Sequence, residues 1–130
     1  MELFSFTQLD KPGVVRRVSL GAGYLGYLGI VILSLLPGSS RPHTGWGGQM
    51  EHVIAYALVG GAFGLGYPFP RSRIVVGVLL TATAAALEGL QYLIPGRTPE
   101  LISFAAGLFG AWIGVGLAIA TLKISGLRYI

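Results

Sequence analysis

Glu88, Gln91 and Tyr92 are the side chains whose types and spacing most readily suggest chemistry. They lie near the end of the apolar run Ile74–Ile94, and Arg97 follows directly after a Pro-Gly break. Residues three and four apart share one face of a helix, so the carboxylate, amide and phenol lie together. As a helix the run is about 31 Å long, the thickness of a bilayer core, and Glu88 lies about 9 Å below the surface. An ionisable residue at that depth indicates a functional site, unless it only joins helices through hydrogen bonds.

A second polar pair stands at the start of the apolar run Met50–Tyr67. His52 and Tyr56 are four residues apart and share a helix face, whereas Glu51 points elsewhere by about 100°. The pattern is not HExxH, so it does not predict a zinc protease. Without a recognisable nucleophile–base pair or metal cluster, we expect no metal and no other cofactor. For acid–base chemistry the sequence offers one candidate pair, Glu88 with His52.

The composition indicates the class of protein that positions these groups. Of the 130 residues, 53% are apolar and only 11% are charged, against about 25% charged in soluble domains. The mean hydropathy is +0.72, and the 21 glycines suit membrane helices. The basic residues flank the apolar runs and do not cluster with aromatic residues, so no nucleic-acid partner is expected. The absence of cysteine excludes disulfides and a cysteine nucleophile.

The apolar runs predict an all-α, polytopic membrane protein that is a four-transmembrane-helix bundle. A cytoplasmic or interfacial segment is expected at 1–17, one membrane domain at 18–122 and a cytoplasmic tail at 123–130. Short connections favour antiparallel neighbours, so spans one and two should pair, as should spans three and four. The expected spans are 18–36, 50–67, 74–94 and 101–122.

Charge asymmetry predicts the orientation of these spans. Only two of the nine basic residues, Arg41 and Arg97, fall in the first and third connections between the expected spans. With four spans, the positive-inside rule then places both termini in the cytoplasm and the candidate site near the outer face. The other seven basic residues flank the termini or the 68–73 loop: Lys11, Arg16, Arg17, Arg71, Arg73, Lys123 and Arg128.

Small residues recur along three of the expected helices. Their spacing of three or four residues puts them on one helix face, where they let neighbouring helices approach closely. We therefore expect these faces to hold the bundle together. The helix-packing positions are Gly26, Gly60, Gly64, Gly107, Gly110 and Gly114.

Four segments together resemble the VanZ-like family of small bacterial integral membrane proteins. They are LSLLPG at 33–38, EHVIAY at 51–56, LEGLQYLIPGR at 87–97 and LISFAAGLFGAWIG at 101–114. The resemblance implies a multi-pass protein of the bacterial inner membrane with a role in the cell envelope, and it supplies no settled reaction. The site residues that it carries over are His52, Tyr56, Glu88, Gln91 and Arg97.

The chain also departs from the family pattern, as a degenerate member would. Family members commonly have an Asp-Lys pair before the histidine, where this chain has Gly48 and Gln49. They commonly have Asp and Asn in the last helix, where this chain has Ser103 and Gly107. An activity that needs several carboxylates at one site would therefore lack partners here.

Three functions follow from these observations, and the first is a non-catalytic binding or accessory protein. Its outward-facing polar cluster would hold an anionic lipid or a cell-wall-related headgroup, with membrane lipids or a lipid-linked envelope intermediate as partners. We expect Arg97 and His52 at its rim, because arginine binds phosphate and carboxylate in a bidentate manner. Glu88 should lie deeper and form hydrogen bonds to Tyr56 or Gln91.

The second hypothesis is a structural or assembly subunit whose glycine faces pack against other membrane proteins. The third is a membrane-embedded acid/base enzyme, in which Glu88 and His52 exchange protons with a substrate. The sequence favours binding over catalysis, because no nucleophile–base pair is recognisable. A simpler role also remains open for two of the loop charges, since Arg97 and Glu100 can pair with each other.

Overall fold

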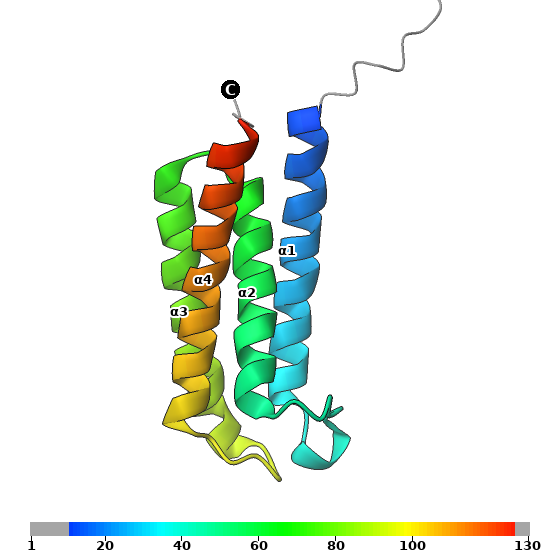
Figure 1. The fold of residues 1–130 in the computed structure, drawn as a ribbon. Coiled ribbons are helices and arrows are strands. Elements are labelled where there is room, and N and C mark those ends of the chain that lie inside the picture. The colour runs from blue at the N-terminus through cyan, green and yellow to red at the C-terminus, as the bar shows by residue number, and fades with distance from the viewer. Residues whose placement is uncertain (1–10, 127–130) are drawn as a thin grey trace, which may run out of the picture.

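The computed structural model describes residues 11–126. These residues form four α-helices that stand side by side in up-and-down order, and residues 11 and 126 lie at the same end of the bundle (Figure 1). The all-α prediction is therefore confirmed for the described chain, and residues 1–10 and 127–130 of the predicted segments 1–17 and 123–130 lie outside it. The elements are α1 (Lys11–Leu35), η2 (Gly38–Ser40), α2 (Gly48–Gly66), α3 (Pro70–Leu90), η3 (Gln91–Leu93) and α4 (Leu101–Ser125).

Proline and glycine set several helix ends, and some differ from the expected spans. The described part of α1 already includes Lys11 and Pro12, so this helix extends well before the expected start at residue 18. α3 likewise begins at Pro70. It ends at Leu90, where η3 tightens the chain ahead of Pro95. α4 ends at Ser125, and the φ of 66° at Gly126 then gives a left-handed cap.

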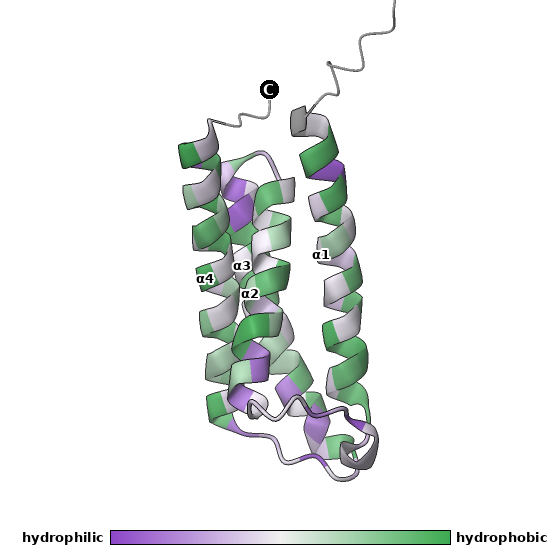
Figure 2. Ribbon diagram, turned by 45° about the vertical axis from the view of Figure 1, so that its right-hand side comes forward, coloured by the Kyte–Doolittle hydropathy of each residue, from purple (hydrophilic) through white to green (hydrophobic). Residues whose placement is uncertain are grey.

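Three helical stretches of the described chain are long and apolar enough to cross a membrane: Gly13–Leu35, Pro70–Leu93 and Leu101–Ser125. Hydrophobic residues run along the helices, and hydrophilic residues gather toward their ends (Figure 2). α2 is apolar along most of its length, but its first turns hold Gln49, Glu51 and His52. The helices therefore indicate a membrane protein, as the composition predicts.

α2 lies at the centre of the bundle and packs most extensively against α4. The expected contacts of α1 with α2 and of α3 with α4 are present, but the larger α2–α4 contact was not expected. Glycines explain it, because a Cβ on Gly60 would lie 2.5 Å from the carbonyl oxygen of Ala111. Gly110 and Gly114 of α4 face backbone carbonyls of α2 in the same way. The two backbones thus touch without intervening side chains.

The other expected packing glycines also lie at helix–helix contacts. A Cβ on Gly26 of α1 would lie 2.8 Å from Val59 of α2, and one on Gly64 would lie 2.7 Å from Ala118 of α4. Gly107 faces α2 and α3. All six glycines therefore lie at close helix–helix contacts, and the three that meet backbone carbonyls are where a larger side chain would push helices apart.

Candidate functional site

Two Pro-Gly turns meet at the end of the bundle away from residues 11 and 126, which we call the loop end (residues 36–47 and 91–100). The backbone N–H of Gly38 donates to the carbonyl of Pro95 over 3.1 Å. A side chain on Gly38 would run into the carbonyl of Gly96, which itself has a φ of 72°. Glycine is thus required at both turns, by close approach at one and by a left-handed backbone at the other. The segments after α1 and α3 are therefore locked together.

Arg97 and Gln91 bind the last carbonyl groups of α1. Arg97 Nε donates to the carbonyl of Leu36 over 2.8 Å, and Arg97 Nη2 donates to that of Leu33. Gln91, which is buried, donates from Nε2 to the carbonyl of Ser34 over 3.1 Å. The last carbonyls of a helix lack intrahelical partners and carry partial negative charge, so a guanidinium there is stabilising. Both predicted site residues thus also cap α1.

Glu51 holds the 41–46 segment over the start of α2. Its Oε2 accepts from Arg41 Nη2 over 2.6 Å. Its Oε1 accepts from the backbone N–H of Thr44 over 3.1 Å and from the Thr44 hydroxyl over 2.8 Å. The Thr44 hydroxyl in turn accepts from the backbone N–H of Trp46. One carboxylate therefore organises the loop that covers the candidate site.

His52 and Tyr56 stack on one face of α2, with ring centroids 6.3 Å apart and planes inclined by 16°. His52 Nδ1 lies 2.7 Å from the carbonyl oxygen of Gly48. Because a carbonyl only accepts, Nδ1 carries the proton and Nε2 of the neutral ring is left as an acceptor. Tyr56 is 3% exposed, and its ring lies 3.2 Å from where a Cβ on Gly107 would be. Gly107 thus makes room for this ring.

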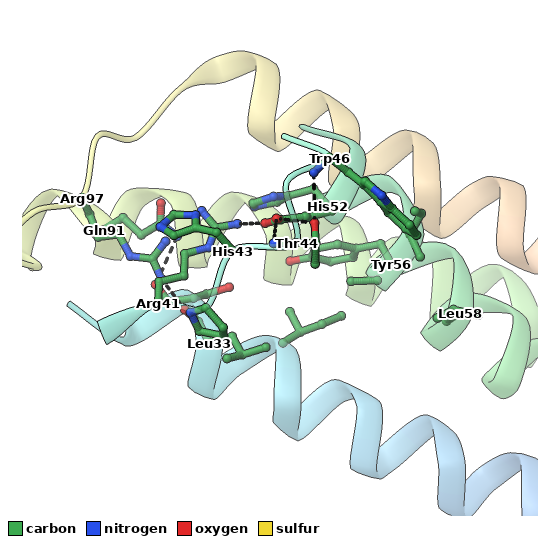
Figure 3. A pocket seen from close by; sticks show the side chains of 16 residues that line it. Leu33, Arg41, His43, Thr44, Trp46, His52, Tyr56, Leu58, Gln91 and Arg97 are labelled. Atoms are coloured by element: carbon green, nitrogen blue, oxygen red, sulfur yellow. Dashed lines mark hydrogen bonds and ion pairs between the residues drawn. The ribbon is translucent and has the colours of Figure 1, made fainter. Parts of the chain in front are cut away.

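These groups enclose a cavity of about 350 Å³ between α1, α2 and the loop end, which we call the loop-end cavity (Figure 3). Its polar wall includes two arginines and one carboxylate, for a net charge of 2 − 1 = +1 with neutral histidines. Most of the lining is apolar, and its aliphatic residues are Ile30, Leu33, Ile54, Ala55 and Leu58. The polar lining residues are Ser34, Arg41, His43, Thr44, Glu51, His52, Gln91 and Arg97.

The two arginines of the cavity influence each other. Burial, followed by the neighbouring Arg41 guanidinium, lowers the pKa of Arg97, while Glu88 raises it. Arg97 binds α1 through Nε and Nη2, and Arg41 binds Glu51 through Nη2. A guanidinium has five N–H donors, so Nη1 of Arg97 and both Nε and Nη1 of Arg41 take no part in these bonds. The cavity therefore joins unused donors with an excess of positive charge.

Glu88 lies outside the lining of the cavity, although the other four predicted site residues line it. Its Oε1 accepts from the backbone N–H of Glu100 over 2.6 Å, at the start of α4. The expected hydrogen bond from Glu88 to Tyr56 or Gln91 was therefore wrong. The alternative in which Arg97 pairs with Glu100 is not seen either, because Arg97 binds carbonyls of α1 and Glu100 Oε2 accepts from Gln49 Nε2 over 3.3 Å. Glu88 closes the turn between α3 and α4.

Arg41, Thr44 and Glu51 belong to the cavity although sequence reasoning did not single them out. A local sequence signal could have identified them. Glu51 lies in the first turn of α2, and Arg41 and Thr44 precede it by only ten and seven residues, so they must stay close to the start of that helix. No group of three or more His, Cys, Asp or Glu side chains within residues 11–126 could hold a metal ion. The cavity can therefore bind through charge and hydrogen bonds, but its described residues do not form a metal centre.

No family model, no curated protein and no solved structure matches this chain. The resemblance to the VanZ-like family thus rests on the four motifs alone and stays a prediction. Two of these motifs, at 33–38 and 87–97, are joined in space through the bond between Gly38 and Pro95. They form one structural unit at the loop end, together with the cavity that they border.

Proposed function

We propose that the chain is a bacterial inner-membrane protein with four spans and with both termini in the cytoplasm. α2 is not among the three stretches that are apolar enough by themselves to cross a membrane. Its central position among these three helices supports counting it as the fourth span. The end near residues 11 and 126 carries Arg16, Arg17, Arg71, Arg73 and Lys123. The loop end and the helix turns next to it hold all three carboxylates of the described chain, Glu51, Glu88 and Glu100. The positive-inside rule assigns the basic end to the cytoplasm.

Cysteine labelling of intact cells tests this orientation. Ser40 at the loop end and Ser125 at the end of α4 are both exposed, and the chain has no native cysteine. Ser40→Cys should react with a membrane-impermeant maleimide, whereas Ser125→Cys should react only after the cells are permeabilised. The reverse pattern would invert the topology, and labelling of both variants in intact cells would contradict four spans.

The function that the geometry supports best is binding of an anionic lipid headgroup at the outer face. One observation carries this proposal: two arginines, each with N–H donors beyond those in its bonds to the protein, line a cavity that is otherwise mainly apolar. Phosphate and carboxylate are the groups that arginine binds most strongly, through paired charge-assisted hydrogen bonds. The apolar wall suits the part of a lipid that follows its headgroup. Membrane lipids and lipid-linked envelope intermediates share this chemistry, as the VanZ-like resemblance would suggest.

Lipid titration followed by native mass spectrometry tests the binding function. The wild-type protein should bind phosphatidylglycerol in preference to phosphatidylcholine, and Arg41→Gln should weaken phosphatidylglycerol binding about tenfold. Arg41 is the informative position because its pair with Glu51 lies near the surface, where such pairs contribute about 1 kcal/mol or less to stability. The melting temperature should therefore change little.

Arg71→Gln is the matched control, because it removes the same charge from an exposed position at the opposite end. It should leave the preference for phosphatidylglycerol intact. Equal losses of binding in the two variants would show that anionic lipid is held by overall positive charge, and the proposed site would then be wrong. Unchanged binding in Arg41→Gln would also contradict it.

The geometry gives less support to an acid/base enzyme. Glu88 is committed to the Glu100 N–H and lies outside the cavity lining that contains His52. Glu51 does line the cavity, but both of its oxygens accept hydrogen bonds from Arg41 and Thr44, which stabilise its charged form and make it a weak base. Neither carboxylate is thus arranged as a proton acceptor for a bound substrate.

A further inference from the structure

A second cavity of about 610 Å³ lies between α1, α2 and α4. Leu58 lines both this cavity and the loop-end cavity, so the two adjoin on α2. The second cavity then continues along α2 away from the loop end. We call it the apolar groove, and its walls and floor include Ala22, Gly26, Gly61, Ala62, Leu65 and Ala118.

The groove exists because small residues occupy the place between α1 and α4. On α2, Leu58, Gly61, Ala62 and Leu65 are spaced by three, one and three residues, which puts them on one helix face. A Cβ on Gly61 would find its nearest neighbour, the carbonyl oxygen of Gly114, at an ordinary 3.5 Å. Gly61 therefore leaves the floor of the groove without a side chain, and α2 and α4 are not in tight contact at this point.

The dimensions and polarity of the two cavities match the two parts of one lipid molecule. From Ile54 in the loop-end cavity to Leu65 in the groove, α2 rises about 16 Å, roughly half the thickness of a bilayer core. At the far end the hydroxyl of Thr121 donates to the carbonyl of Leu117 over 2.8 Å, so its donor is satisfied without a polar partner in the groove. The loop-end cavity and the apolar groove together thus form a space that holds charged groups near the membrane surface and is apolar below it.

We propose that the apolar groove holds one hydrocarbon chain of the same anionic lipid whose headgroup is bound in the loop-end cavity. This inference rests on the proposed function and adds that the chain is recognised together with the headgroup. A groove open to the bilayer core is filled by hydrocarbon, and the chain that enters from the loop end is the one tethered to the headgroup site. Affinity should therefore depend on chain length at a constant headgroup.

Two phosphatidylglycerols with the same headgroup, one with dioleoyl and one with dihexanoyl chains, test this inference. Ala62→Phe fills the floor of the groove and should weaken binding of the dioleoyl lipid about tenfold, because buried CH₂ contacts are lost. Binding of the dihexanoyl lipid should be unchanged. Ala22→Phe, on the exposed α1 wall, should act in the same way and serves if Ala62→Phe does not fold.

Ala82→Phe is the control, since Ala82 is an exposed alanine of α3 that lines neither cavity. If both groove variants bind the dioleoyl lipid like Ala82→Phe, while Arg41→Gln still weakens both lipids, the groove proposal is overturned and the headgroup site stands. If Arg41→Gln changes the binding of neither lipid, the proposed headgroup site itself is wrong. A groove that takes up any lipid would show equal losses for phosphatidylglycerol and phosphatidylcholine in Ala62→Phe, which would also overturn the proposal.

Discussion

Gly110→Leu is expected to cost about 3 kcal/mol of folding free energy or more. A Cβ at this position would meet the carbonyl oxygen of Val53 and would lie 2.9 Å from the Val53 Cα. Backbone atoms cannot rotate aside as a flexible side chain can, so α2 and α4 would have to separate. Because these two helices form the largest contact in the bundle, the loss would spread to the whole fold. The melting temperature in detergent and the monodisperse fraction after size-exclusion chromatography measure it.

Gly116→Leu is a matched control on the same helix, because a Cβ at Gly116 would meet nothing within 4 Å. This variant should melt at the wild-type temperature or slightly above it, since leucine is favoured over glycine in a helix by up to about 1 kcal/mol. If both variants keep the wild-type melting temperature, the glycine stripe of α4 faces lipid and the orientation of α4 in the bundle is wrong.

The sequence predicted the fold class and the packing faces because these depend on local patterns. Apolar runs, proline breaks and glycine spacing are each visible within one helix, and the structure uses all of them. The dominance of the α2–α4 contact could not be read in this way. It depends on which helices place their glycine faces against each other, such as the faces that contain Gly60 in α2 and Gly110 in α4. Several helices carry such a face, and the sequence does not indicate which two faces pair.

The candidate site was predicted in part for the same reason. His52 and Tyr56 share a helix face, and their place beside each other follows from their spacing. The partners of Glu88 did not follow, because a carboxylate near a helix end can turn toward the bundle or toward the next helix start. Here it binds the Glu100 N–H. The partners of Arg97 depend on the docking of two turns that are distant in sequence, through Gly38.

Arg97→Gln is expected to loosen the end of α1 and to lower the folding free energy by about 2–3 kcal/mol. Two charge-assisted hydrogen bonds, to the carbonyls of Leu33 and Leu36, would be lost or weakened. The favourable interaction of the cation with the C-terminus of the helix would be lost as well. Thermal unfolding measures the loss, and amide hydrogen exchange should become faster in the segment after α1, where Gly38 is bonded to Pro95.

Two further variants separate the shape of the Arg97 side chain from its charge. Arg97→Lys keeps the positive charge but replaces the planar fork with a single ammonium, so an intermediate loss of stability is expected. Arg71→Gln removes a charge from an exposed position at the other end and should melt like the wild type. If Arg97→Gln also melts like the wild type, with unchanged exchange after α1, then Arg97 does not hold the helix end. Its bonds to α1 would then be too weak to fix the wall of the loop-end cavity, and Arg41 would remain as the cation that defines the site.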